Sequence, residues 1–143
     1  MKSIIFRLLI VSFTAYDTNK AISYARTYCK EYNKAYLKYD SDSSNFVSQC
    51  LKAGGQDLNG CTGLDSKGSF QKVANLRTCL STKKWKYQQG LPKQFKPGYP
   101  FFNGNSNAMI ATAISGKTVT YCGHTNDRCD AKIENDNYFY YYL

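Results

Sequence analysis

Residues 42–55 read DSSNFVSQCLKAGG, and this stretch says more about the fold than any other part of the chain. Its apolar side chains recur at helical spacing, at Phe46, Val47, Cys50 and Leu51. This spacing predicts a helix that begins near Ser43 and buries one face. The pair Gly54-Gly55 predicts where that helix ends, because glycine readily adopts the backbone conformation that terminates helices.

Working outward, the pattern predicts a helix over residues 19–36, capped by Thr18, and another over residues 69–80. Residues 81–103 look irregular. Two strands are expected over 108–114 and 117–122, joined by the turn Ser115-Gly116, with a final strand over 137–143. Helices followed by antiparallel strands indicate an α+β class. At 143 residues, the chain fits a single domain.

The amino terminus has the features of a secretion signal. Lys2 precedes a mostly apolar run over residues 4–13, which Arg7 interrupts, and Thr14-Ala15 offers small residues for cleavage. We therefore expect a signal peptide over residues 1–15, a mature domain over residues 16–143 and a secreted, extracellular protein. The run is too short to span a bilayer. An alternative is a buried amphipathic segment at the amino terminus.

Charge and histidine content narrow the choice of function. The chain has 19 Lys and Arg against 10 Asp and Glu, a formal charge of +9, which becomes +7 without Lys2 and Arg7. Such a charge suits an anionic partner, such as a cell-wall glycan or other wall polymer, a membrane surface or nucleic acid. No nucleic-acid-binding motif is present. A single histidine excludes mechanisms that need two histidines, such as a ribonuclease with paired imidazoles or a zinc site with several histidine ligands.

Six cysteines form an even set in a small basic chain, and secretion favours three disulfides among them. They are Cys29, Cys50, Cys61, Cys79, Cys122 and Cys129. Cys122 with Cys129 is the first expectation, since the two flank a short loop. Cys50 with Cys61, or Cys61 with Cys79, would close a glycine-rich loop. A metal site on Cys122, His124 and Cys129 is the alternative, but the spacing fits no zinc pattern. We expect no metal and no cofactor.

The stretch at 42–55 resembles the signature of a family of putative amidases, papain-like domains related to the NlpC-type and CHAP-type cell-wall cysteine peptidases. Their motif runs DCTNFVSQ, then two variable residues, then Ala or Ser and Gly-Gly. Residues 16–36 resemble the family's first helix, 106–110 its first catalytic strand and 124–128 a loop near its carboxyl end. The resemblance implies a papain-like fold with helices packed on a small antiparallel sheet.

In that family a cysteine at a helix amino terminus attacks the amide, a histidine on the adjacent strand takes the proton, and a polar residue orients the imidazole. This chain departs from the pattern at both decisive positions. Ser43 stands at the nucleophile position and Asn107 at the base position. An asparagine amide cannot act as a base near neutral pH. His124 would match the third position, and the resemblance therefore implies a degenerate site made of Ser43, Asn107 and His124.

Ser43 has three interpretations: a helix cap formed with Asp42, a replacement of a catalytic cysteine, or an active nucleophile that uses His124. His124 could equally do no more than bond the backbone. Possible ligand contacts are Asp42, Asn45 and Trp85, the last in a basic-aromatic cluster over residues 83–87.

Three hypotheses follow. The first is a secreted, disulfide-stabilised and catalytically inactive amidase-like domain that binds a glycan, a cell-wall peptide or an extracellular protein, or that self-assembles. The second is an active amide hydrolase that uses Ser43 with His124, or one of the cysteines expected in a disulfide, such as Cys50. The third is a basic membrane-active defence protein.

Overall fold

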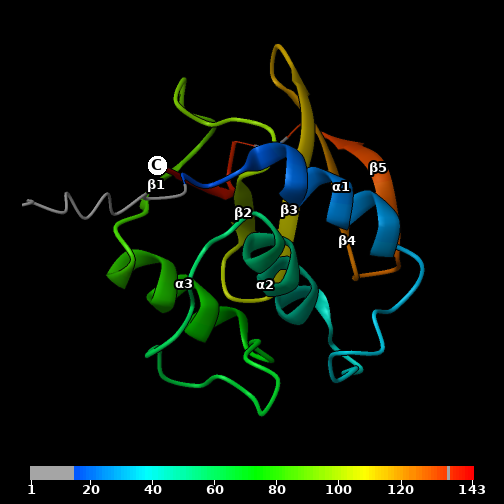
Figure 1. Cartoon of the computed structure of the whole chain (residues 1–143). Coiled ribbons are helices and arrows are strands. Elements are labelled where there is room, and N and C mark those ends of the chain that lie inside the picture. Colours follow the sequence, from blue (N-terminus) through cyan, green and yellow to red (C-terminus); the bar gives the residue numbers. More distant parts are fainter. Residues whose placement is uncertain (1–14, 135) are drawn as a thin grey trace, which may run out of the picture.

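The computed structural model describes residues 15–134 and 136–143, and it has three helices on one antiparallel sheet (Figure 1). The helices are α1 (Thr18–Tyr28), α2 (Ser43–Ala53) and α3 (Val73–Thr82). The strands are β1 (Lys86–Gln89), β2 (Pro100–Asn103), β3 (Asn107–Ser115), β4 (Thr118–Gly123), β5 (Arg128–Ile133) and β6 (Phe139–Tyr142). The predicted α+β class is therefore confirmed. The expected signal peptide falls almost wholly on residues 1–14, which lie outside the described residues.

The six strands lie in the order β1-β6-β2-β3-β4-β5, and every neighbouring pair is antiparallel. The β3–β4 hairpin confirms the prediction for residues 108–122, and its turn contains Gly116 with a φ of 59°. The predicted strand at the carboxyl end is β6, which pairs with both β1 and β2. The end of the chain thus lies inside the sheet.

Helix α2 is the centre of the molecule. Every residue from Ser43 to Leu51 is buried, because α1 packs on one side of the helix and β3 on another (Figure 1). Its end confirms the Gly-Gly prediction. Gly55 has a φ of 93° and donates to the Lys52 carbonyl, and Gln56 N–H donates to the Leu51 carbonyl at 2.9 Å. These two bonds form the Schellman motif.

Helix α1 is shorter than predicted. Its amino-terminal cap is Asp17 rather than Thr18, since the Asp17 carboxylate accepts a bond from Lys20 N–H at 3.1 Å. It ends at Tyr28 instead of Tyr36, and Cys29 directly after it is bonded to Cys129 of β5. The tyrosines at helical spacing beyond this point lie in a loop and not on a helix face, and Tyr32 in this loop packs against His124.

The region from 69 to 103 also differs from the prediction. Helix α3 begins at Val73 and not at Ser69, and the segment expected to be irregular contains β1 and β2. Trp85 is 3% exposed, its ring packs against Tyr16 and Tyr99, and its Nε1 donates to Gln56 Oε1 at 2.8 Å. The expectation that Trp85 contacts a ligand is therefore wrong: the side chain belongs to the core.

The disulfides are Cys29–Cys129 and Cys61–Cys79. The second was one of the predicted alternatives, while the pairing of Cys122 with Cys129 is wrong. Cys50 and Cys122 are free and buried, so the expectation of three disulfides is not met. Cys50 lies on α2 and Cys122 on β4, both under the packed interface between helices and sheet. Within the described residues, no helix is long and apolar enough to cross a membrane.

Candidate functional site

Ser43 is the first residue of α2 and points at the beginning of β3. Its Oγ accepts a hydrogen bond from the Ala108 backbone N–H at 3.2 Å, and the residue is 2% exposed. Asn107, the first residue of β3, is therefore the immediate neighbour of the group that Ser43 contacts. Residues far apart in the sequence meet here because the amino-terminal end of α2 packs against the beginning of β3.

Asp42 precedes α2 and joins three segments through its carboxylate. Oδ1 accepts from Tyr39 N–H and from Asn45 Nδ2, both at 2.9 Å, while Oδ2 lies 2.5 Å from His124 Nδ1. No side-chain bond from Asp42 caps the helix, so the cap interpretation of this residue is wrong for its carboxylate. The Asp42 side chain instead fixes the loop before α2, the first turn of α2 and the end of β4.

His124 follows β4 and is buried. Its ring is stacked on Phe46, at a centroid distance of 4.0 Å, and meets the tilted ring of Tyr32 at 4.2 Å. Nδ1 contacts Asp42, and Nε2 lies 2.6 Å from the Tyr28 carbonyl oxygen. Both ring nitrogens are thus engaged with oxygen acceptors, and neither bonds Ser43 or Asn107. One of the predicted interpretations, that His124 bonds the backbone, is met at Nε2.

Asn107 is engaged elsewhere as well. Its Oδ1 accepts from Thr125 Oγ1 at 2.7 Å, which ties the start of β3 to the loop after β4. The fold therefore brings Ser43, Asn107 and His124 to one end of the sheet without linking them in a proton relay. A serine hydroxyl needs a base to become a nucleophile. Among the described residues, none is hydrogen-bonded to Ser43 Oγ in a way that would accept its proton.

Cys50, the alternative nucleophile, is fully buried in the core. Burial raises the pKa of its thiol well above the ordinary value, and the neighbouring Cys122 raises it further. A catalytic cysteine requires the opposite shift, toward thiolate. The buried thiol of Cys50 therefore has the properties of a structural cysteine.

Asn45 was a candidate ligand contact, but its side chain is buried and donates to the Leu37 carbonyl at 2.6 Å as well as to Asp42. Its role is to hold the loop before α2 in place. The metal alternative fails too, because Cys129 is in a disulfide and both nitrogens of His124 are occupied. No cluster of three potential metal ligands occurs among the described residues.

An open groove flanks this site. One cavity of about 340 Å³ is lined by Ser41, just before Asp42, and by Ser106, just before Asn107, together with the first residues of α3. A second cavity, of about 250 Å³, shares Ala74 and Asn105 with the first and contains Arg77. We call these two adjoining cavities the α3 groove. Sequence analysis missed Arg77, because no motif surrounds it. Its place in this cavity is seen only in the fold, where it bonds Tyr141 of β6 and Gly104 before β3.

Comparison with known proteins supports the resemblance seen in the sequence. A family model described as "Putative amidase domain" matches residues 15–103, which is more than half of the chain and includes Ser43. Asn107 and His124 lie beyond the matched residues. The "Uncharacterized protein YhbB" of Bacillus subtilis (strain 168) is 40% identical over 45 residues, which cover 32% of this chain.

Those 45 residues cover 14% of that curated relative, so the chain spans only a small part of its length. No solved structure matches the chain. The family match rests on the segment that contains α1, α2 and α3, the same segment that forms one wall of the site and of the α3 groove. The chain belongs to the family described as "Putative amidase domain".

Proposed function

We propose that this chain is a secreted binding protein built on an amidase domain that has lost hydrolytic activity. Ser43 and Asn107 would stand at the positions of the nucleophile and the base of a papain-like site related to those of NlpC-type and CHAP-type peptidases. The ligand would be a cell-wall peptide, an anionic glycan or another extracellular protein, held beside the site. Disulfides and a positive formal charge of +9 support an extracellular role near anionic material.

One observation carries the proposal: the Ser43 hydroxyl is buried against the Ala108 N–H, and the single histidine is committed to Asp42 and Tyr28. An acyl transfer site needs its nucleophile exposed to substrate and bonded to a base. Moving His124 toward Ser43 would remove it from two aromatic rings and from two buried hydrogen bonds. This arrangement favours a structural role for His124 over a catalytic one.

The test is a hydrolysis assay with the purified, oxidised chain on bacterial peptidoglycan and on peptide amides, with the release of new amino groups as the readout. We expect no release above the rate without protein. In the same preparations, co-sedimentation with peptidoglycan measures binding independently of cleavage. A fluorophosphonate probe, which labels activated serines, should leave Ser43 unlabelled.

Measurable cleavage that disappears in Ser43→Ala would contradict the proposal and support the alternative of an active hydrolase. Ser48→Ala is the matched control, because Ser48 lies on the same helix and its hydroxyl bonds only the Ser44 carbonyl. Cleavage that survives Ser43→Ala but is lost in Cys50→Ala would instead identify the buried thiol. Leakage of anionic vesicles at low salt would favour the membrane-active hypothesis.

A further inference from the structure

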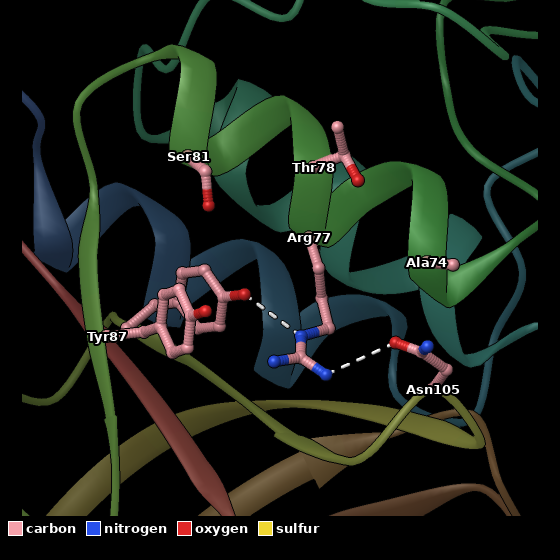
Figure 2. Close-up of a pocket in the computed structure, with 7 residues that line it drawn as sticks. Ala74, Arg77, Thr78, Ser81, Tyr87 and Asn105 are labelled. Atoms are coloured by element: carbon pink, nitrogen blue, oxygen red, sulfur yellow. Dashed lines mark hydrogen bonds between the residues drawn. The ribbon is translucent and has the colours of Figure 1, made fainter.

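Arg77 lies in the second cavity of the α3 groove without an acidic partner. Its side chain extends from α3 toward Asn105 and Tyr87 (Figure 2). Nε donates to Tyr141 Oη at 2.9 Å, and Nη1 donates to the Gly104 carbonyl at 3.1 Å and to Asn105 Oδ1 at 3.2 Å. All three acceptors are neutral oxygens. Two are amide oxygens, and the third is the Tyr141 hydroxyl, whose pKa is raised by burial, so that it stays protonated near pH 7.

The guanidinium is therefore held in place but not neutralised. No ion pair within the described residues includes Arg77, and its third nitrogen, Nη2, has no hydrogen-bond partner among them. A guanidinium presents its donors in a fixed planar fork that suits carboxylates. Arg77 thus offers an open donor next to a cavity of about 250 Å³.

Aromatic rings fix the orientation of this cation. Its Cζ lies 4.6 Å from the Phe139 ring centroid and 5.6 Å from that of Tyr87. Tyr87 is itself stacked on Tyr141 at 5.0 Å and is half exposed, so part of its ring is accessible to a ligand. The Cys61–Cys79 disulfide anchors α3 close to Arg77. A side chain restrained in this way loses little entropy when it binds an anion.

The neighbouring cavity suits an extended peptide. Its walls carry the hydroxyls of Ser41 and Ser106, the amide of Gln71 and the ammonium of Lys72. These groups can donate to and accept from peptide bonds. None of the residues that line either cavity is acidic.

We propose that the α3 groove binds a peptide and that Arg77 holds a carboxylate of that peptide. The ion pair would form at Nη2, with the adjoining residue of the peptide lying against the exposed part of the Tyr87 ring. This inference rests on the proposed binding function and names its ligand class, an acidic or carboxyl-terminal peptide segment. It does not depend on whether Ser43 is active, because Arg77 lies in the cavity away from Ser43.

The experiment uses the full ¹⁵N-labelled chain and two peptides, acetyl-Ala-Ala with a free carboxylate and the same peptide with a terminal amide. We expect chemical-shift changes at Arg77, Asn105 and Tyr87 with the acid and not with the amide. Sodium acetate is the third arm. It should shift the same resonances only at a concentration at least about tenfold higher, since it lacks the peptide contacts.

Ser81→Asp tests the site by adding a negative charge beside Arg77 while every residue that Arg77 bonds is kept. Ser81 lines the same cavity, lies on α3 one turn after Arg77 and is exposed. A carboxylate there can pair with Arg77 and should weaken binding of the acid by about tenfold or more. Ser81→Asn is the matched neutral comparison, since it has the size of Asp without its charge, and it should bind the acid more tightly than Ser81→Asp does. Lys117→Gln, on the exposed β3–β4 turn, controls for the loss of one positive charge.

Arg77→Gln should abolish the preference for the acid, and Arg77→Lys should reduce it because the planar fork is lost. If Arg77→Gln does not fold, the comparison of Ser81→Asp with Ser81→Asn still tests whether a carboxylate binds at Arg77. Equal binding of acid and amide, or unchanged binding in Ser81→Asp, overturns the proposal. Acetate that binds as tightly as the peptide overturns the peptide assignment. Hydrolysis by the natural chain would contradict the proposed function but leave the Arg77 site standing, so the two failures are distinguishable.

Discussion

His124 Nδ1 lies 2.5 Å from Asp42 Oδ2, and this contact connects the end of β4 to the residue before α2. Both side chains are almost fully buried, at 1% and 2% exposure. The other ring nitrogen of His124 bonds the Tyr28 carbonyl. The other carboxylate oxygen of Asp42 accepts hydrogen bonds from Tyr39 N–H and Asn45 Nδ2. The two residues therefore form a buried polar centre that holds helix and sheet together at the candidate site.

His124→Ala should destabilise the fold by about 3–5 kcal/mol, the range for truncating a large buried aromatic ring. The substitution leaves the Asp42 carboxylate without its ring partner and empties the space between Phe46 and Tyr32. Urea unfolding followed by circular dichroism measures the loss. A double-mutant cycle with Asp42→Asn isolates the pair, and a coupling energy near zero would refute the role assigned to this contact.

Gly98→Ala should destabilise the fold more than Gly104→Ala. Both glycines have a positive φ, 93° and 53°, which costs an alanine about 1–2 kcal/mol. Only Gly98 meets a neighbour, because a Cβ there would lie 2.6 Å from Thr18 Cβ, whereas nothing approaches Gly104. Thermal unfolding of the two variants compares them directly. Equal losses would show that the contact between this loop and α1 contributes nothing.

Alkylation of the free cysteines tests the assignment of two disulfides and two buried thiols. The native chain should not react with iodoacetamide, because Cys50 and Cys122 are buried and burial raises the pKa of both thiols. Unfolding in urea without reductant should expose two reactive thiols, which mass spectrometry detects. Cys50→Ala and Cys122→Ala should each reduce the count by one. A chain with no reactive thiol after unfolding would have a third disulfide.

The fold should lose stability at alkaline pH. Burial raises the pKa of Tyr32 to about 12, helped by its hydrogen bond to Asp127, and burial likewise raises the pKa of Tyr140 to about 12. An unfolded tyrosine ionises near its model value of 10.0. The stabilisation is therefore complete below pH 10.0 and is lost as the pH rises through about 12.

Absorbance at 295 nm during a pH titration reports these ionisations. Tyr32→Phe should remove one late-titrating group and flatten the loss of stability between these pH values, while it keeps the ring that packs against His124. Tyr142→Phe, on β6, serves as the comparison. If the native chain and Tyr32→Phe lose stability equally, the hydroxyl of Tyr32 is not linked to folding.

The parts of the fold that sequence predicted well are those with a strong local pattern. Helix α2 has an apolar face and a glycine pair, and the β3–β4 hairpin has apolar strands around a glycine turn. The missed strands lack such patterns. β1 is exposed along its whole length, and the burial of β5 alternates only between exposed and half-buried residues. Their pairing depends on strands elsewhere in the chain.

The candidate site was predictable in position but not in its bonding. The family resemblance assigned Ser43 and Asn107 to one site, yet the sequence could not show that His124 faces Asp42 and the Tyr28 carbonyl instead of Ser43. Trp85 was misassigned because it sits among lysines in sequence while its ring packs in the core. Arg77 has no local signal at all, since its partners come from β6 and from the loop before β3.

The Cys29–Cys129 disulfide has a mechanical consequence. It joins residues 100 positions apart, so α2, α3 and strands β1 to β4 lie within one covalent loop, whereas β6, which carries Tyr141 of the α3 groove, lies outside it. A pulling force applied at residues 15 and 143 would pass through this bond, so it could lengthen only the segments before Cys29 and after Cys129. The contacts under load would include the pairing of β6 with β1 and β2 and the bond between Tyr141 and Arg77. Tension would thus open the α3 groove at Tyr141 while the covalent loop kept α2 and α3 from being drawn apart.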